Sequence, residues 1–335
     1  MEKIYAPVKV TTLCRYEHFK RCIESLSRCT GANETELFIG LDYPAKKEHW
    51  PGYNKISSYV YTIKGFKEVH VFRREVNYGP LKNSRDLSET ISKRFDRYIA
   101  TEDDNEFSPN FLEYMNGYLE KYKDNPQVLY ICGYYYPFEK ANIKDSYPYK
   151  SFPMKSYNAW GSGSWFYKRE KVAGFADNSK VRGYLQDSKL IRKLFKLKLN
   201  VIVHRMLQRY QSGACGDLLI RSYVALNNCY CIFPRVSKVR NNGFDGSGLN
   251  CYVNESYKQQ SIDTDTTFQI EDFELKDYDE ILSAYKAIYE RGWIINFLCV
   301  MEYWIFRIFK INIVANKGFI KLRKRFHLYK VVSKS

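Results

Sequence analysis

Three consecutive acidic side chains, Glu102, Asp103 and Asp104, are the feature of this 335-residue sequence with the clearest chemical meaning. Holding three carboxylates together is unfavourable unless a cation offsets their repulsion. A hard divalent ion such as Mn2+ or Mg2+ prefers oxygen ligands and can bridge carboxylates to a diphosphate. The triplet follows an expected strand at 97–100 and precedes an expected helix at 109–122, which begins with a proline. The sequence therefore predicts a metal site at the end of a strand.

Alternating strands and helices in the first 135 residues would position this acidic triplet. Strands are expected at 8–13, 36–41, 68–72, 97–100 and 128–133, and helices at 18–27, 83–94 and 109–122. This alternation predicts an α/β fold with a mostly parallel sheet flanked by helices. Ligands of such sheets bind beyond the carboxyl ends of the strands, where Asp42 and the triplet fall. Further along, we expect a long loop at 134–157 and helical structure at 189–211.

The residues around the triplet resemble the metal-binding segment of family 13 glycosyltransferases, the N-acetylglucosaminyltransferase I type. The resemblance rests on Glu102-Asp103-Asp104, Glu106, Ser108-Pro109, Phe111 and Glu113-Tyr114. Weaker matches follow in the same order over roughly residues 5–250, at Pro7 to Val10, Arg15, Leu41-Asp42, Gly161 to Trp165, Cys215 to Leu218 and Ile232 to Ser237. The resemblance implies a GT-A type fold and a bacterial relative of the family.

The resemblance also implies how a nucleotide-sugar donor would be held. Asp104 matches the direct ligand of Mn2+ or Mg2+. Glu102 and Asp103 match residues that contact the sugar or ribose and support the ion. Arg15 and Asp42 match residues that grip the nucleotide. Asp42 is equally explained as a turn residue, because a proline follows two positions later.

On the acceptor side, Asp217 matches the carboxylate that deprotonates the acceptor hydroxyl in an inverting, single displacement. Asp217 also fits a helix N-cap, and Asp187 is the rival candidate for the base. Two tryptophans that flank the family's acidic pair are replaced here by Cys215 and Leu218, so acceptor stacking must differ.

A glycine-rich segment is also expected to contact the acceptor. It contains Trp160, Gly161, Gly163 and Trp165, and it resembles the family's Gly-x-Gly-Trp turn. A tryptophan beside small residues at a sheet edge can form a wall on which a sugar stacks. The alternative is that both tryptophans are ordinary core aromatics.

The composition excludes several classes of protein. An apolar fraction of 45% is too high for a disordered chain, and 18 Gly with 10 Pro excludes a collagen-like repeat. The nine cysteines contain no CxxC pair, which favours reduced thiols in the cytosol over a zinc site. The net charge of +16 leaves open a nucleic-acid-binding module, and the triplet leaves open a metal-dependent nucleotidyltransferase or phosphotransferase.

The end of the chain differs from the rest, so we predict two units, a GT-A glycosyltransferase domain at 1–255 and a helical, aromatic and basic extension at 256–335. The stretch 293–314 is apolar, but Glu302, Arg307 and Lys310 make a membrane span too costly. Residues 286–335 hold 11 basic and two acidic side chains. We therefore expect a cytoplasmic protein without a nucleic-acid partner, peripheral at the inner face of the plasma membrane, that acts on a lipid-linked glycan.

Overall fold

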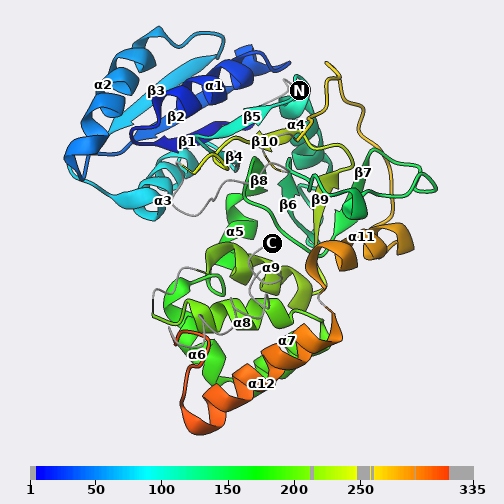
Figure 1. Cartoon of the computed structure of the whole chain (residues 1–335). Helices are drawn as coiled ribbons and strands as arrows, with labels where there is room; N and C mark the ends of the chain where they lie inside the picture. Colours follow the sequence, from blue (N-terminus) through cyan, green and yellow to red (C-terminus); the bar gives the residue numbers. More distant parts are fainter. Residues whose placement is uncertain (1–4, 212–214, 247–256, 258–259, 291, 317–335) are drawn as a thin grey trace.

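The computed structural model describes residues 5–211, 215–246, 257, 260–290 and 292–316 (Figure 1). The first half of the chain alternates strands and helices in the order β1 Val8–Thr12, α1 Tyr16–Ser27, β2 Glu36–Leu41, α2 Trp50–Tyr59, β3 Glu68–Arg73, α3 Gly79–Ser92, β4 Arg97–Glu102, β5 Asn105–Phe107, α4 Phe111–Lys121 and β6 Val128–Cys132. Short 3-10 turns lie at Ala32–Glu34, Lys47–His49 and Val60–Thr62.

The second half of the chain adds short strands and most of the helices. In order they are β7 Ser151–Met154, β8 Ser162–Trp165, α5 Phe166–Ala173, α6 Val181–Gln186, α7 Ser188–Lys196, α8 Asn200–Gln208, α9 Gly216–Leu226, β9 Tyr230–Pro234, β10 Val239–Asn241, α11 Asp279–Tyr289 and α12 Trp293–Phe309. Figure 1 shows α6 to α9 with α12 as a helical lobe beside the sheet.

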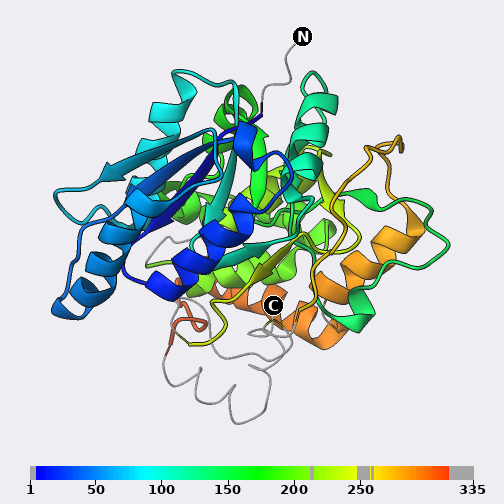
Figure 2. The same cartoon turned by 90° about the horizontal axis from the view of Figure 1, so that it is seen from above.

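Eight strands form the central sheet in the order β3-β2-β1-β4-β8-β6-β9-β7. Strands β3, β2, β1 and β4 are parallel neighbours, and β6 and β9 are parallel to each other. Strands β8 and β7 run against their neighbours. Figure 2 shows helices on both faces of the sheet. The predicted α/β fold, a mostly parallel sheet flanked by helices, is confirmed.

The alternating side chains of β2 explain why helices cover both faces. Leu37 and Ile39 pack into the core that contains Phe19 of α1. Phe38, between them, points to the opposite face and packs with Leu87 of α3. Because both faces are apolar, the strand is buried along its whole length.

The structure refines one predicted region and differs in another. The helical structure expected at 189–211 is confirmed as two helices, α7 and α8, because Lys198 between them has a φ of 60°, which a right-handed helix does not accommodate. The expected loop at 134–157 contains β7, which pairs with β9 as the edge strand of the sheet. Its Pro153 fits an edge position, where one side of the strand forms no ladder.

The described residues beyond the predicted boundary at 255 pack against the first part of the chain. The Phe268 ring lies 5.1 Å from that of Tyr114 in α4, and Lys238 forms an ion pair with Asp263. Helix α12 packs against α8. The division into two units stays a prediction, and the basic segment 317–335 lies outside the described residues. Among these, no single helix is long and apolar enough to cross a membrane; α11 and α12 meet that test only together, bent by 62°.

Candidate active site

Asp103 and Asp104 are both buried just beyond β4, and they share one arginine. Arg15, which precedes α1, forms ion pairs with Asp103 and, over 2.8 Å, with Oδ2 of Asp104. Thr12 at the end of β1 donates its hydroxyl to Asp103 over 2.9 Å. Because β1 and β4 are parallel neighbours, their carboxyl ends bring these residues to one edge of the sheet. The structure thus brings Arg15 onto the acidic triplet.

The electrostatics of this pairing follow from burial. Burial raises the pKa of Asp103 above its ordinary value, although the adjacent Arg15 charge and the Thr12 hydrogen bond hold it down in part. Burial by itself would lower the pKa of Arg15, but Asp103 and Asp104 raise it. Arg15 therefore stays charged and offsets much of the carboxylate repulsion.

The two-stranded sheet of β5 and β10 brings a second segment onto Asp104. Asn241, at the end of β10, donates its amide to Asp104 Oδ1 over 3.2 Å, and the backbone N–H of Asn242 donates to the Asp104 carbonyl oxygen over 2.8 Å. A Cβ on Gly243 would lie 2.3 Å from Asp104 Oδ2. Only glycine therefore lets this turn approach the carboxylate so closely.

Glu102, the first residue of the triplet, is influenced both by its neighbours in the triplet and by Asp217 of α9. Its side chain is open to solvent on one side, but the protein around it limits its hydration. This desolvation, with the charges of Asp104, Asp217 and Asp103, raises the pKa of Glu102 to about 8. Since such an effect falls off with distance, Asp217 of α9 lies near Glu102.

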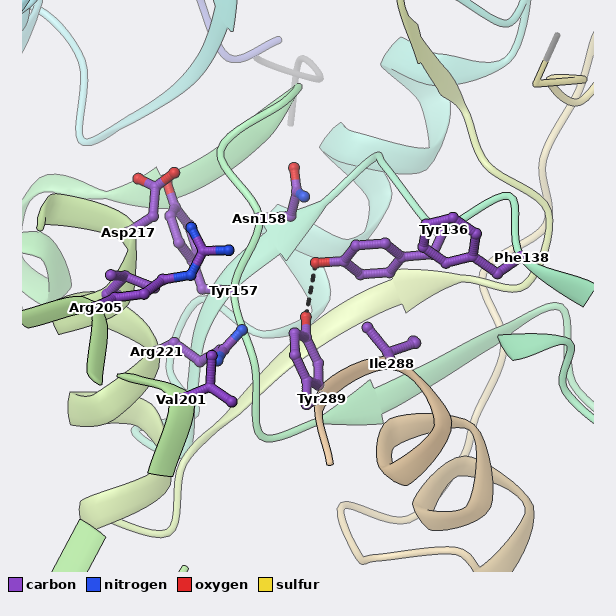
Figure 3. A pocket seen from close by; sticks show the side chains of 11 residues that line it. Tyr136, Phe138, Tyr157, Asn158, Val201, Arg205, Asp217, Arg221, Ile288 and Tyr289 are labelled. Carbon is purple, nitrogen blue, oxygen red and sulfur yellow. Dashed lines mark hydrogen bonds between the residues drawn. The ribbon is translucent and has the colours of Figure 1, made fainter. Parts of the chain in front are cut away.

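Asp217 lies in the first turn of α9 and helps to line a cavity of about 190 Å³ (Figure 3). The side chain of Asp217 is open to solvent on one side, but desolvation by the protein around it raises its pKa, and the charges of Arg209 and Arg221 oppose that rise. Asp217 is not the N-cap of α9, which is Cys215. Among the described residues, no hydrogen bond engages its carboxylate. A carboxylate that the protein desolvates but does not engage in a hydrogen bond suits a general base.

Asp187, the rival base, and Asp42, the predicted nucleotide contact, both accept hydrogen bonds from backbone N–H groups. Asp187 is the N-cap of α7 and accepts hydrogen bonds from the N–H groups of the two residues that follow Ser188. Asp42 accepts the N–H groups of Tyr43, Tyr78 and Gly79 within 2.9 Å. Asp42 thereby ties the end of β2 to the start of α3. The contact of Asp42 with a nucleotide stays a prediction, whereas its hydrogen bonds stabilise the junction between β2 and α3.

The glycine-rich segment serves packing more than an acceptor. Trp165 is fully buried, with the Lys168 ammonium 3.6 Å from its ring centre, so its predicted stacking against a sugar is wrong. Gly163 is also buried, and a Cβ there would lie 2.9 Å from Met115 of α4. Gly161 takes a φ of 63° and accepts the Gly133 N–H. The neighbours of these residues are core side chains, which local sequence does not reveal.

Trp160 differs from the other three members of that segment. It is half-buried and packs edge-on against Tyr134, with 4.6 Å between ring centres, and against Phe244. Its backbone N–H donates a hydrogen bond to the side-chain oxygen of Asn158, a residue that lines the cavity. An acceptor contact by Trp160 therefore stays a prediction.

The donor atoms at the triplet suit Mn2+ or Mg2+, because all of them are hard carboxylate oxygens. Within the described ranges, groups of three closely spaced ligand atoms occur at His204–Cys299–Glu302 and at Glu36–Glu68–His70 rather than at the triplet. An ion there would be held by one or two carboxylates, with phosphate and water oxygens completing its shell. Asp104 offers two carboxylate oxygens for this role, and an ion bound there would share them with Arg15 and Asn241.

Sequence reasoning missed several residues that the structure brings to the site. Asn241 and Gly243 lie more than 130 positions from Asp104 in the chain, and their segment resembles an ordinary loop in the sequence. Arg205 and Arg221 line the cavity from α8 and α9. The one available hint was helical spacing, since Arg221 follows Asp217 by four residues and so lies on the same helix face.

Three solved structures align with parts of this one. Staphylococcus aureus TarS aligns with a TM-score of 0.27 and 13% identity, over 36% of this chain and 20% of its own. A mannosyltransferase from Pyrobaculum calidifontis, in complex with GDP-Man and Mn2+, aligns with a TM-score of 0.36 and 10% identity over 51% of this chain and 47% of its own. Mouse xyloside xylosyltransferase 1 has a TM-score of 0.34 and 10% identity, over 67% and 81%.

This chain thus spans a fifth of the first of these proteins and about half of the second. No family model matches the chain, and no curated protein matches its sequence. The resemblance to family 13 rests on the sequence pattern at 102–114 and on the weaker matches over roughly residues 5–250.

Proposed function

We propose that the protein is an inverting, metal-dependent glycosyltransferase that moves a sugar from a nucleotide-sugar to a hydroxyl of a glycan. One observation carries the proposal. Asp217 lines a cavity, and its charge acts on Glu102, the first residue of the acidic triplet. A base and a cation site on opposite sides of one space are what a single displacement at a sugar carbon requires. The pattern at 102–114 supports kinship with family 13.

On the donor side, the chain's own residues bind and orient the diphosphate. Asp104, supported by Glu102, would hold Mn2+ or Mg2+, which neutralises the charge of the leaving diphosphate. Arg15 sits against both buried aspartates, so its guanidinium lies where a phosphate oxygen would approach the ion. Thr12 and Asn241 fix the orientation of the two aspartates.

On the acceptor side, Asp217 would take the proton of the attacking hydroxyl. A raised pKa makes its carboxylate a stronger base than an exposed aspartate, while it stays ionised when the pH exceeds that pKa. The cavity beside it gives room for a sugar unit and has Tyr136, Tyr157 and Tyr289 in its wall. Aromatic walls of this kind pack against the apolar faces of sugars.

The test is donor hydrolysis and transfer with a panel of nucleotide-sugars in the presence of Mn2+. We expect at least one donor to be hydrolysed by the wild type and not by Asp104→Ala. The matched control is Asp187→Ala, which removes an exposed carboxylate that caps α7 and should retain activity. The proposal is lost if no donor is bound or hydrolysed, or if Asp104→Ala matches the wild type. Release of pyrophosphate from nucleoside triphosphates would instead favour a nucleotidyltransferase.

We also propose that the protein works at the inner face of the plasma membrane, on a lipid-linked glycan of a bacterial surface polysaccharide. Helix α12 supports this. One face packs inward through Ile295, Cys299, Tyr303 and Phe306. The other leaves large apolar side chains exposed, namely Trp293, Ile294, Phe297, Met301, Ile308 and Phe309. A helix with such a face beside a basic segment is typical of interfacial binding to anionic lipid.

A further inference from the structure

Among the described residues, the cavity beside Asp217 is lined by two cations and one carboxylate. It lies between the end of the sheet and the helical lobe, and these three residues are Arg205, Arg221 and Asp217 (Figure 3). Asp217 and Arg221 come from α9, and Arg205 comes from α8. A single carboxylate thus faces two guanidinium groups.

Arg221 is held in place without an acidic partner. Its guanidinium carbon lies 4.0 Å from the centre of the Tyr289 ring, a cation–π contact that fixes its plane. In the part of the chain that the structure describes, its Nε is buried without a hydrogen-bond partner, and no ion pair engages it. A half-buried guanidinium whose donors stay unused is costly, because desolvation removes water without a replacement.

The charge imbalance increases during the proposed reaction. Arg221 and Asp217 are one helical turn apart, and the Arg221 charge holds down the pKa of Asp217 in part. When Asp217 takes a proton from the acceptor, its negative charge disappears and both arginines remain. An anion bound in the cavity would offset this change and use the free donors of Arg221.

Tyr289 makes the position of Arg221 rigid. Its hydroxyl accepts a hydrogen bond from Ser156 over 2.7 Å and lies 2.9 Å from the Tyr136 hydroxyl. These contacts join α11 to the segment before β8, so the ring under Arg221 is fixed from two sides. A preorganised guanidinium fork loses little entropy when it binds a planar or tetrahedral anion.

We propose that this cavity binds an anionic group of the acceptor, with Arg221 as its principal contact and Arg205 as the second cation. The chemical class is an acidic sugar unit, either a hexuronic acid with a carboxylate or a sugar phosphate. The assignment of the anion to the acceptor rests on the proposed function. The diphosphate of the donor belongs instead with Arg15 and the acidic triplet, on the other side of Asp217.

Binding of three matched probes tests this proposal. They are 4-nitrophenyl β-D-glucuronide, the neutral 4-nitrophenyl β-D-glucoside, and the 6-phosphate of that glucoside, each titrated with EDTA and without nucleotide. We expect an anionic probe to bind at least about tenfold more tightly than the glucoside, as a charge-assisted hydrogen bond predicts. The carboxylate and phosphate probes distinguish the two sources of the anion.

Variants then locate the anion. Arg221→Gln should abolish the preference and Arg221→Lys should keep part of it, because a lysine retains the charge but not the fork. Arg182→Gln is the matched control: Arg182 also lies over a tyrosine ring, that of Tyr210, in the same helical lobe but away from the cavity. Circular dichroism melting checks that each variant folds.

Two results would overturn the proposal. One is that neither anionic probe binds more tightly than the glucoside, including the case in which no probe binds. The other is that folded Arg221→Gln retains the full preference. Because these titrations contain no donor and no metal, failure of the glycosyltransferase proposal in the donor panel would leave a measured anion preference standing. Conversely, donor turnover without that preference would refute this inference alone.

Discussion

The turn that contains Gly243 should control the position of the Asp104 carboxylate, so Gly243→Ala is an informative perturbation. The added Cβ would lie 2.3 Å from Asp104 Oδ2 and 3.1 Å from Asn241 Oδ1, whereas ordinary contacts begin at 3.4 Å. The carboxylate or the turn must therefore move by about 1 Å, and a misplacement of that size costs on the order of 100-fold in rate. The movement would also weaken the 2.8 Å ion pair with Arg15.

The assay is kcat/KM for hydrolysis of the best donor of the panel, together with calorimetric binding of UDP or GDP in the presence of Mn2+. We expect Gly243→Ala to lose about 100-fold in kcat/KM while its urea unfolding midpoint changes little, because the strain falls on a site side chain. Gly183→Ala is the matched control. It adds the same methyl group to α6, where nothing lies within 4 Å.

A Gly243→Ala protein that binds and hydrolyses the donor as well as Gly183→Ala would refute this reasoning. It would mean that Asp104 tolerates displacement, and therefore that its observed position is not the one that holds the ion. A loss of folding instead of activity would equally contradict it, because the contact would then serve the fold.

Three further predictions concern the base, the fold and the membrane face. Asp217→Asn should lower kcat by about 100-fold or more and remove the acid limb of the pH–rate profile. Only the ionised carboxylate accepts a proton, and desolvation raises the pKa of Asp217. Wild-type activity should therefore rise with pH through a midpoint above the usual aspartate value. Asn83→Ala should cost about 1–3 kcal/mol in urea unfolding, because the buried amide donates to the Gly40 carbonyl and accepts from Arg74; the exposed Lys82→Ala serves as control. Replacing both Trp293 and Phe297 of α12 by serine should reduce cosedimentation with phosphatidylglycerol vesicles about tenfold, whereas the same change at the equally exposed Tyr61 and Leu81 should not.

Much of the sheet could be predicted because its signals are local. Apolar runs such as 36–41 match β2 residue for residue, since a buried strand is read from consecutive side chains. Helix α2 was not anticipated, although Pro51 beside Trp50 is a helix-start signal. The helical structure expected at 189–211 is confirmed as α7 and α8, but the break between them could not be predicted, because lysine carries no preference for the left-handed conformation of Lys198.

In the candidate site, too, local contacts could be predicted from the sequence and contacts between distant segments could not. The proximity of Arg15 to the triplet followed from strand order, because both lie after parallel strands. The burial of Trp165 did not follow, since it depends on α4 and on Lys168 of α5 closing over the ring. Asp187 and Asp217 both precede apolar helical runs, so only the fold separates the helix cap from the residue that lines the cavity.

By itself, the sequence determined the class of fold and predicted the edge of the sheet at which the candidate site lies. Side-chain periodicity encodes strands and helices, and a carboxylate cluster after a strand predicts a cation site without reference to the rest of the chain. Only the tertiary structure decided that Asn241 and Gly243 support Asp104 and that Arg221 faces the cavity beside Asp217. These contacts join segments that are distant in the chain, and their geometry is set by the packing of whole elements rather than by any local pattern.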